Sequence, residues 1–277
     1  MRVPGRVVSL VLLCIAAGAV AVRASDLNGF VREKGHVDVA PSVTFESYDE
    51  FWVGETQVAD PGVGQVDTTS LAIWVAYGIT DDLTFVANVP WVDADSDGLD
   101  GFGESDLQDL TVLGKYRFAT LGTNVRSQFI GAFGLRTPLS SYEDDLPVDV
   151  GDGTTDWLAR FVYQLEVGAF YASQQLGFDL RGGDAPNGVP LYTEAGYTVG
   201  RTTFSAGFAK LLAAGGTDIG DPGFTFPSNE EEYERVAAKV YFRASERVGV
   251  AVAGFTTLDG RNTGDTTGYS LGVNIGF

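Results

Sequence analysis

The sequence is poor in several residue types. Its 277 residues include one Cys, one Met and one His, and 18 Lys and Arg stand against 37 Asp and Glu, which gives a formal net charge of −19. Phosphate binding needs a basic footprint, so this acidic balance excludes nucleic acid as a partner. The lone His36 and the absence of a Gly-x-Ser-x-Gly or paired metal-ligand motif leave no catalytic constellation, so we expect no enzyme.

Long hydrophobic runs are also absent, except at the N-terminus. Residues 1–24 begin with two arginines, continue with an apolar run over 7–22, and end on Val22-Arg23-Ala24. The run is about sixteen residues, short of the roughly twenty that a membrane-spanning helix needs, so it predicts a secretory signal peptide cleaved after Ala24. Cys14 would leave with it. An exported chain without disulfides needs another source of stability, such as a closed, hydrogen-bonded barrel.

From His36 onward, apolar residues alternate with other residues at period two, the pattern of β-strands. Short and long connections between these segments also alternate. The short ones are 80–82, 121–123, 166–169, 200–201 and 245–246, and the long ones are 51–66, 93–106, 139–156, 182–190, 212–231 and 259–265. They divide the chain into about twelve strands. Short turns at one rim and long loops at the other are typical of a bacterial outer-membrane barrel.

The alternation also separates two faces. One face is apolar and carries no charge: examples are Leu71, Ile73 and Val75 in one segment and Val248, Val250 and Val252 in another. Charged residues take the intervening positions, as expected for a lumen, since a charge on the lipid face costs several kcal/mol. A soluble β-sandwich shows similar alternation, but Tyr and Trp recur near the strand ends, as an aromatic girdle requires.

The C-terminal segment ends on an aromatic residue after strict alternation, with Tyr269, Leu271, Val273, Ile275 and Phe277 on one face. Such a strand is typical of the signal read by the outer-membrane assembly machinery. We therefore predict an all-β, transmembrane, antiparallel up-and-down barrel over residues 36–277, in the outer membrane of a Gram-negative bacterium, with lipid and lipopolysaccharide around it. Two placements stay open for residues 25–35: the periplasm, or the lumen as a plug.

Segment 101–118, GFGESDLQDLTVLGKYRF, resembles the MetA-pathway-of-phenol-degradation family, together with the YGITDDL turn at 77–83 and Val89-Pro90-Trp91. Segments 168–183 and 191–200 are similar too, so the resemblance covers most of the chain after residue 24. Glu104-Ser105-Asp106 departs from the family pattern, where Gly-Asp leads directly into a strand. The resemblance implies an outer-membrane transporter, a passive route for small organic molecules, aromatic ones included.

One acidic segment has the spacing of a calcium-binding loop. The candidate ligands are Asp93, Asp95, Asp97 and Glu104, with Gly98 at the sharp turn. No helices flank it, and acidic external loops serve solvation equally well, so both readings stay open. No other cofactor is predicted.

Basic residues at lumenal positions are the candidate pore lining: Lys115, Arg117, Arg126, Arg136, Arg160, Arg181, Lys239 and Arg243. Either they form ion pairs that fill a narrow barrel, or they line a constriction that favours anionic or aromatic solutes by charge and cation–π contact. The sequence therefore predicts a channel for small organic compounds. The alternative is a structural or surface-interaction barrel that uses its acidic loops, and conductance distinguishes the two.

Overall fold

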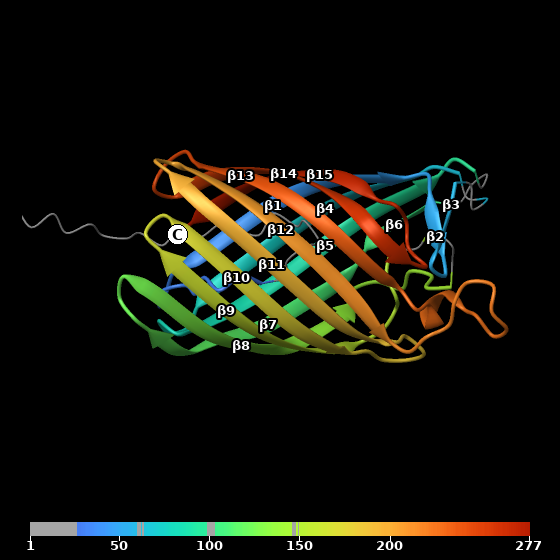
Figure 1. Cartoon of the computed structure of the whole chain (residues 1–277), viewed down its shortest axis with the longest axis horizontal. Helices are drawn as coiled ribbons and strands as arrows, with labels where there is room; N and C mark the ends of the chain where they lie inside the picture. The colour runs from blue at the N-terminus through green and yellow to red at the C-terminus, as the bar shows by residue number, and fades with distance from the viewer. Residues whose placement is uncertain (1–26, 60–61, 63, 99–102, 146–147, 149) are drawn as a thin grey trace, which may run out of the picture.

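A computed structural model describes residues 27–59, 62, 64–98, 103–145, 148 and 150–277 (Figure 1). The predicted signal peptide lies outside these residues. The strands of the main sheet are β1 (Val37–Tyr48), β4 (Val66–Gly78), β5 (Leu83–Ser96), β6 (Gly103–Leu107), β7 (Asp109–Leu121), β8 (Val125–Pro138), β9 (Asp156–Val167), β10 (Phe170–Leu180), β11 (Asn187–Val199), β12 (Thr202–Ala214), β13 (Glu232–Arg243), β14 (Val248–Arg261) and β15 (Thr267–Gly276).

These strands form one closed antiparallel barrel. Strands that follow one another around the barrel pair with each other, β1 pairs with both β4 and β15, and β4 also pairs with β5, so the ring of strands is closed. β6 and β7 both pair with β5 and are separated only by Gln108, so they act as one interrupted strand. The closed barrel of twelve strands is the predicted architecture, and the pairing confirms it. Full closure satisfies the main-chain hydrogen-bonding groups without water.

Short turns and long loops occupy opposite rims, as predicted. The C-terminus lies at the rim with the short turns, here called the inner rim, and the hairpin of β2 (Phe51–Val53) and β3 (Thr56–Val58) lies at the opposite, outer rim (Figure 1). A short 3₁₀-helix, η1 (Phe226–Ser228), sits in the long loop before β13.

Five of the expected long loops need correction. The loops at 212–231 and 259–265 start later than expected, because β12 continues to Ala214 and β14 to Arg261. The loop placed at 93–106 is shorter, because β5 continues to Ser96 and β6 begins at Gly103. The loop at 51–66 contains the β2–β3 hairpin, and the loop at 182–190 ends where β11 starts at Asn187. Main-chain pairing does not require apolar side chains, so strands extend into polar sequence beyond the membrane.

The outer face of the barrel is apolar. Residues predicted to face lipid, such as Ile73 on β4, Tyr116 on β7 and Val252 on β14, are exposed, while their neighbours point inward. Aromatic rings also pair on this face, with Phe133 stacked on Trp157 at 5.5 Å between ring centroids. An exposed apolar belt around a closed barrel is stable only in lipid, so the chain is a barrel of the Gram-negative outer membrane.

No helix within the described residues is long and apolar enough to span a membrane.

Residues 27–35 form a segment whose first six residues lie inside the barrel, in the half nearest the inner rim, while residues 33–35 are exposed at that rim. Leu27 is 4% exposed and packs among inward side chains of β4, β5 and β7 to β9. Its neighbours in this cluster are Ala76, Val86, Leu113, Ile130, Ala132, Leu158 and Val162. The Gly29 amide donates to Gln164 Oε1 at 2.9 Å, and a Cβ built on Gly29 would lie 2.3 Å from the Gln164 Cβ. The segment therefore fits closely against the inner wall. We call it the lumenal segment.

At the outer rim, one asparagine joins three loops. Asn262 is buried and has a positive φ of 48°, a conformation that Asn tolerates better than most residues. Its Oδ1 accepts from the amides of Gly54 at 2.7 Å and Ile219 at 3.2 Å, and its Nδ2 donates to Asp218 Oδ1 at 2.7 Å. Arg261 binds Asp218 through two contacts of 2.7 Å. We call these contacts the loop junction.

We expect loop 215–231 to detach from the loop junction at low pH. Hydrogen bonding from Arg261 lowers the pKa of Asp218 below its ordinary 3.8, so the stabilisation is complete above that value and is lost as the pH falls through the depressed one. We expect amide exchange in the loop to accelerate below pH 3.8, measured by hydrogen exchange and corrected for intrinsic rates. In Asp218→Asn the exchange should be fast already at neutral pH, and unchanged protection in that variant would contradict the assignment.

Candidate functional site

The lumen holds two adjoining cavities in its outer half, each with a volume of about 240 Å³. One lies against β7, β8, β11 and β12, and the other extends toward β1, β4 and the loop junction. They share six lining residues: Gln108, Gly151, Asp152, Arg181, Asn229 and Glu231. Shared walls make them two parts of one space, which we call the outer chamber.

Loop 139–155 folds inward and forms one wall of the outer chamber. Its Val148 packs on Val66 and Ala94, and its Val150 packs on Val92, so inward apolar side chains of β4 and β5 hold the loop. The loop is acidic, but its apolar residues determine its position, because burying them is favourable. Its acidic side chains can still reach polar partners in this position.

Tyr142 fixes the base of this loop. Its hydroxyl donates a short hydrogen bond to Asp109 and accepts one from the Gly153 amide at 3.2 Å. Burial and the contact with Asp109 raise the pKa of Tyr142 well above its ordinary value, so the phenol stays protonated and serves as a donor. The Gln108 side chain, at the break between β6 and β7, donates to the Val150 carbonyl and holds the same loop.

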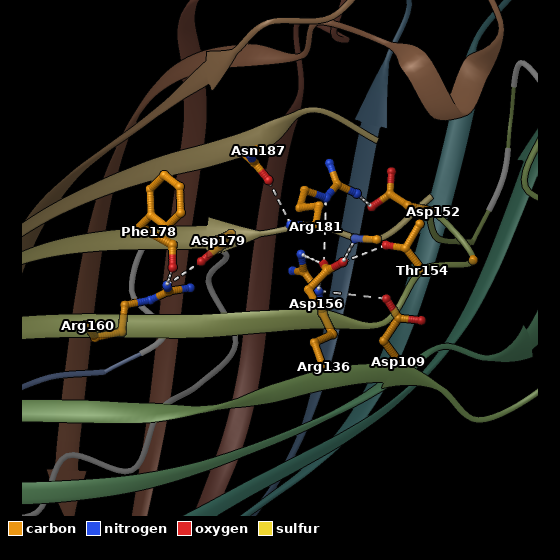
Figure 2. A network of polar contacts seen from close by, with 12 residues as sticks. Asp109, Arg136, Asp152, Thr154, Asp156, Arg160, Phe178, Asp179, Arg181 and Asn187 are labelled. Carbon is orange, nitrogen blue, oxygen red and sulfur yellow. Dashed lines mark hydrogen bonds and ion pairs between the residues drawn. The ribbon is translucent and has the colours of Figure 1, made fainter. Parts of the chain in front are cut away.

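A network of charged side chains lines the chamber beside this loop (Figure 2). Asp156 is 1% exposed and accepts from Arg136 Nη2 at 2.6 Å, from Thr154 Oγ1 at 2.6 Å, and from the Gly182 amide at 3.3 Å. Arg181 lies between Asp156, at 3.6 Å, and Asp152 of the inward loop. On the neighbouring strand pair, Arg160 forms a buried ion pair with Asp179.

The remaining predicted pore-lining residues lie nearer the inner rim. Arg126 binds Glu166 at 2.5 Å, Arg117 binds Asp82 at 2.7 Å, and Lys239 binds Glu194 at 2.9 Å. Arg243 makes no side-chain ion pair with any described residue.

Lys115 is different, because its partners belong to the lumenal segment rather than to the wall. Its buried Nζ donates to the carbonyls of Asn28 at 3.1 Å and Phe30 at 2.6 Å. Most of these basic side chains thus form ion pairs with acidic residues. Their main effect is to connect neighbouring elements of the barrel wall, and little unpaired positive charge faces the lumen.

The four candidate calcium ligands are not brought together by the described part of the chain. Asp93 and Asp95 lie on one face of β5, whereas Glu104 pairs opposite Ala94 and lies on the other face. Asp97 Oδ1 accepts from the Gln65 amide at 2.6 Å, and Glu104 Oε1 from the Glu143 amide at 2.9 Å. Within the described residues, no group of three or more acidic, His or Cys residues is arranged to hold a metal ion. Calcium binding stays a prediction.

The sequence analysis did not single out Arg235 as a site residue. It lies on an inward position of β13 and is 4% exposed. The register between β13 and β14 shifts at Glu234/Arg235, since Glu234 pairs with Asp259 and Arg235 with Thr257. The extra residue of this bulge is Leu258 on β14, so Arg235 keeps the inward parity that it shares with Lys239 and Arg243. The apolar residues within the acidic loop 139–155 were the available signal for the inward fold.

Comparison with solved structures places this architecture beside known barrels. The chain is similar to the COG4313 outer-membrane channel from Pseudomonas putida F1, at 13% sequence identity and a TM-score of 0.75, over 91% of this chain and 98% of that chain. It is also similar to a KdgM porin, at 10% identity and a TM-score of 0.46, over 85% of this chain and 99% of that chain. No family model and no curated protein matches the chain. The chain thus shares its barrel fold with a solved outer-membrane channel, and the resemblance to the MetA-pathway family stays a resemblance.

Proposed function

We propose that the protein is a passive channel, and not an enzyme, that admits small organic compounds through the outer membrane. The observation that carries the proposal is the outer chamber, a lumenal space walled by loop 139–155 on one side and by mixed polar and apolar side chains on the other. Ligand sites in proteins commonly combine an apolar wall with a few placed polar groups. A purely structural barrel needs no such chamber.

The lumenal segment supplies a gate in this proposal. It lies in the lumen on the inner-rim side of the chamber. It belongs to no strand of the sheet, and apart from the Gly35 amide, which donates to the Gly78 carbonyl at 2.8 Å, its contacts named above involve side chains. Such contacts exchange for water more readily than a sheet ladder does. Passage then requires the segment to move aside, and the channel exists mostly closed.

Solute entry into liposomes tests the function. With the full chain reconstituted, we expect small neutral solutes such as phenol and benzyl alcohol to enter faster than into empty liposomes, and a pentasaccharide to be excluded because the chamber is narrow. Liposomes that carry the heat-unfolded chain at the same ratio of protein to lipid serve as the matched control. Solute entry at the rate of empty liposomes, with a folded barrel and a displaced lumenal segment, would sink the proposal and favour a structural or surface-interaction barrel.

A further inference from the structure

Arg235 is a buried cation that has no carboxylate partner in the part of the chain that the structure describes. Its Nε donates to Thr257 Oγ1 at 3.1 Å, and its Nη1 is enclosed without a hydrogen-bond partner among the described residues. The other basic residues of the outer chamber wall are ion-paired, as Arg136 and Arg181 are. A buried guanidinium without an anion is costly, so an isolated one in a cavity wall indicates that the anion comes from outside the chain.

Aromatic rings hold this guanidinium in place. The Arg235 Cζ lies 4.4 Å from the centroid of the Tyr233 ring and 6.0 Å from that of Phe255. Cation–π contact offsets part of the desolvation, and it fixes the plane of the guanidinium without using its donors. With Nε bound to Thr257, the Nη groups remain the donors for an external acceptor, and a carboxylate matches them in charge and hydrogen bonding.

The part of the outer chamber lined by Arg235 has an apolar side and a limited volume. Its apolar lining includes Tyr48, Phe51, Val92, Val148, Val150 and Phe226. At about 30 Å³ per water, the cavity of about 240 Å³ holds roughly eight waters, so it suits a solute of about as many non-hydrogen atoms.

The acids on the same wall restrict the charge of the solute. Asp152 is paired with Arg181, and Glu231 accepts from Thr263 at 3.0 Å, while Glu46 also lines the cavity. Their field repels a second negative charge. One carboxylate directed at Arg235 and an uncharged body fit this wall, and a dicarboxylate does not.

We infer that Arg235, held by Tyr233, is the subsite for the carboxylate of a small monocarboxylic acid with an apolar or aromatic body, bound in the outer chamber. The inference rests on the proposed channel function and names its solute class. Arg235 binds the carboxylate, Tyr233 positions the guanidinium, and the inward wall of loop 139–155 receives the apolar body.

Equilibrium binding to the full chain in detergent micelles tests the inference, with benzoate as the probe. By calorimetry we expect saturable benzoate binding, with benzamide, acetate and phthalate each binding at least about ten-fold more weakly. Benzamide lacks the negative charge, acetate lacks the aromatic ring, and phthalate carries a second negative charge. Arg235→Gln should weaken benzoate binding at least about ten-fold, and Arg235→Lys should weaken it less, since it keeps the charge without the fork. Arg201→Gln, at an exposed arginine in the short turn between β11 and β12, should bind as the unchanged chain does.

Heat-modifiable migration in gels shows which variants are folded, and Arg235→Lys keeps the test decisive if Arg235→Gln does not fold. Equal binding of benzoate and benzamide, or benzoate binding unaffected by both Arg235 substitutions, would overturn the inference. Binding is measured separately from transport, so the two proposals can fail separately. If phenol still enters liposomes but benzoate does not bind, the carboxylate subsite is overturned and the channel function stands. If benzoate binds but no solute enters the liposomes, the channel function is overturned and the carboxylate subsite stands.

Discussion

Leu27→Ala opens the channel by about 30-fold in the ratio of open to closed states. A buried Leu to Ala change costs about 2 kcal/mol or more, and about 1.4 kcal/mol corresponds to ten-fold in an equilibrium. Leu27 contributes that burial only while the lumenal segment is inside the barrel, so the loss favours the displaced state. Open probability in planar-bilayer recordings is the measurement, and it should rise toward saturation.

A second variant reaches the same state by a different route. Gly29→Val places a Cβ where Gln164 already lies, so the lumenal segment cannot keep its position. Lys34→Ala removes an exposed side chain of the same segment and should leave open probability unchanged. If both Leu27→Ala and Gly29→Val record the same currents as Lys34→Ala, the lumenal segment is no gate.

Asp156→Ala produces the largest expected loss of stability. Asp156 is the buried acceptor for Arg136 and lies 3.6 Å from Arg181, so its removal leaves Arg136 without its nearest anion and Arg181 with Asp152 alone. Breaking a buried pair by removing one partner costs about 3–5 kcal/mol. Urea unfolding of the barrel in lipid vesicles should show a loss of that size.

Glu234→Ala is the matched control, because Glu234 forms a half-exposed ion pair with Lys210 at 2.6 Å. Exposed pairs contribute up to about 1 kcal/mol, so this variant should unfold close to the unchanged chain. Equal losses for Asp156→Ala and Glu234→Ala would show that the network around Asp156 is solvated and contributes little to stability.

The barrel itself was predictable because it follows from local rules. Alternation at Leu71, Ile73 and Val75 fixes which side chains face lipid, and the alternation of short turns with long loops fixes strand order and direction. Strand ends were less predictable, as at Asp93 and Asp95, because polar residues continue a ladder once its neighbour is in register.

For the lumen, the sequence predicts which side chains point inward but not which partners they contact. Inward parity identified Arg136 and Arg160 as lumenal, but which acid each meets depends on the pairing of β8, β9 and β10 across strands. Inward parity likewise places Arg235 in the lumen, but its contact with Thr257 depends on a bulge in β14, and the place of Leu27 depends on a cavity lined by several strands. These are tertiary facts that no local pattern of residues encodes.

The loop junction has a consequence for how the barrel comes apart. Gly54 and Asn262 are 208 residues apart, and they bind each other beside the line where the first strand, β1, meets the last, β15. That pairing can form only after the whole chain has been made, so closure of the ring is a late step in assembly. Once closed, the ring can unzip at this line only if the contacts of Asn262 break as well. The junction therefore slows separation of β1 from β15 and lengthens the lifetime of the inserted barrel.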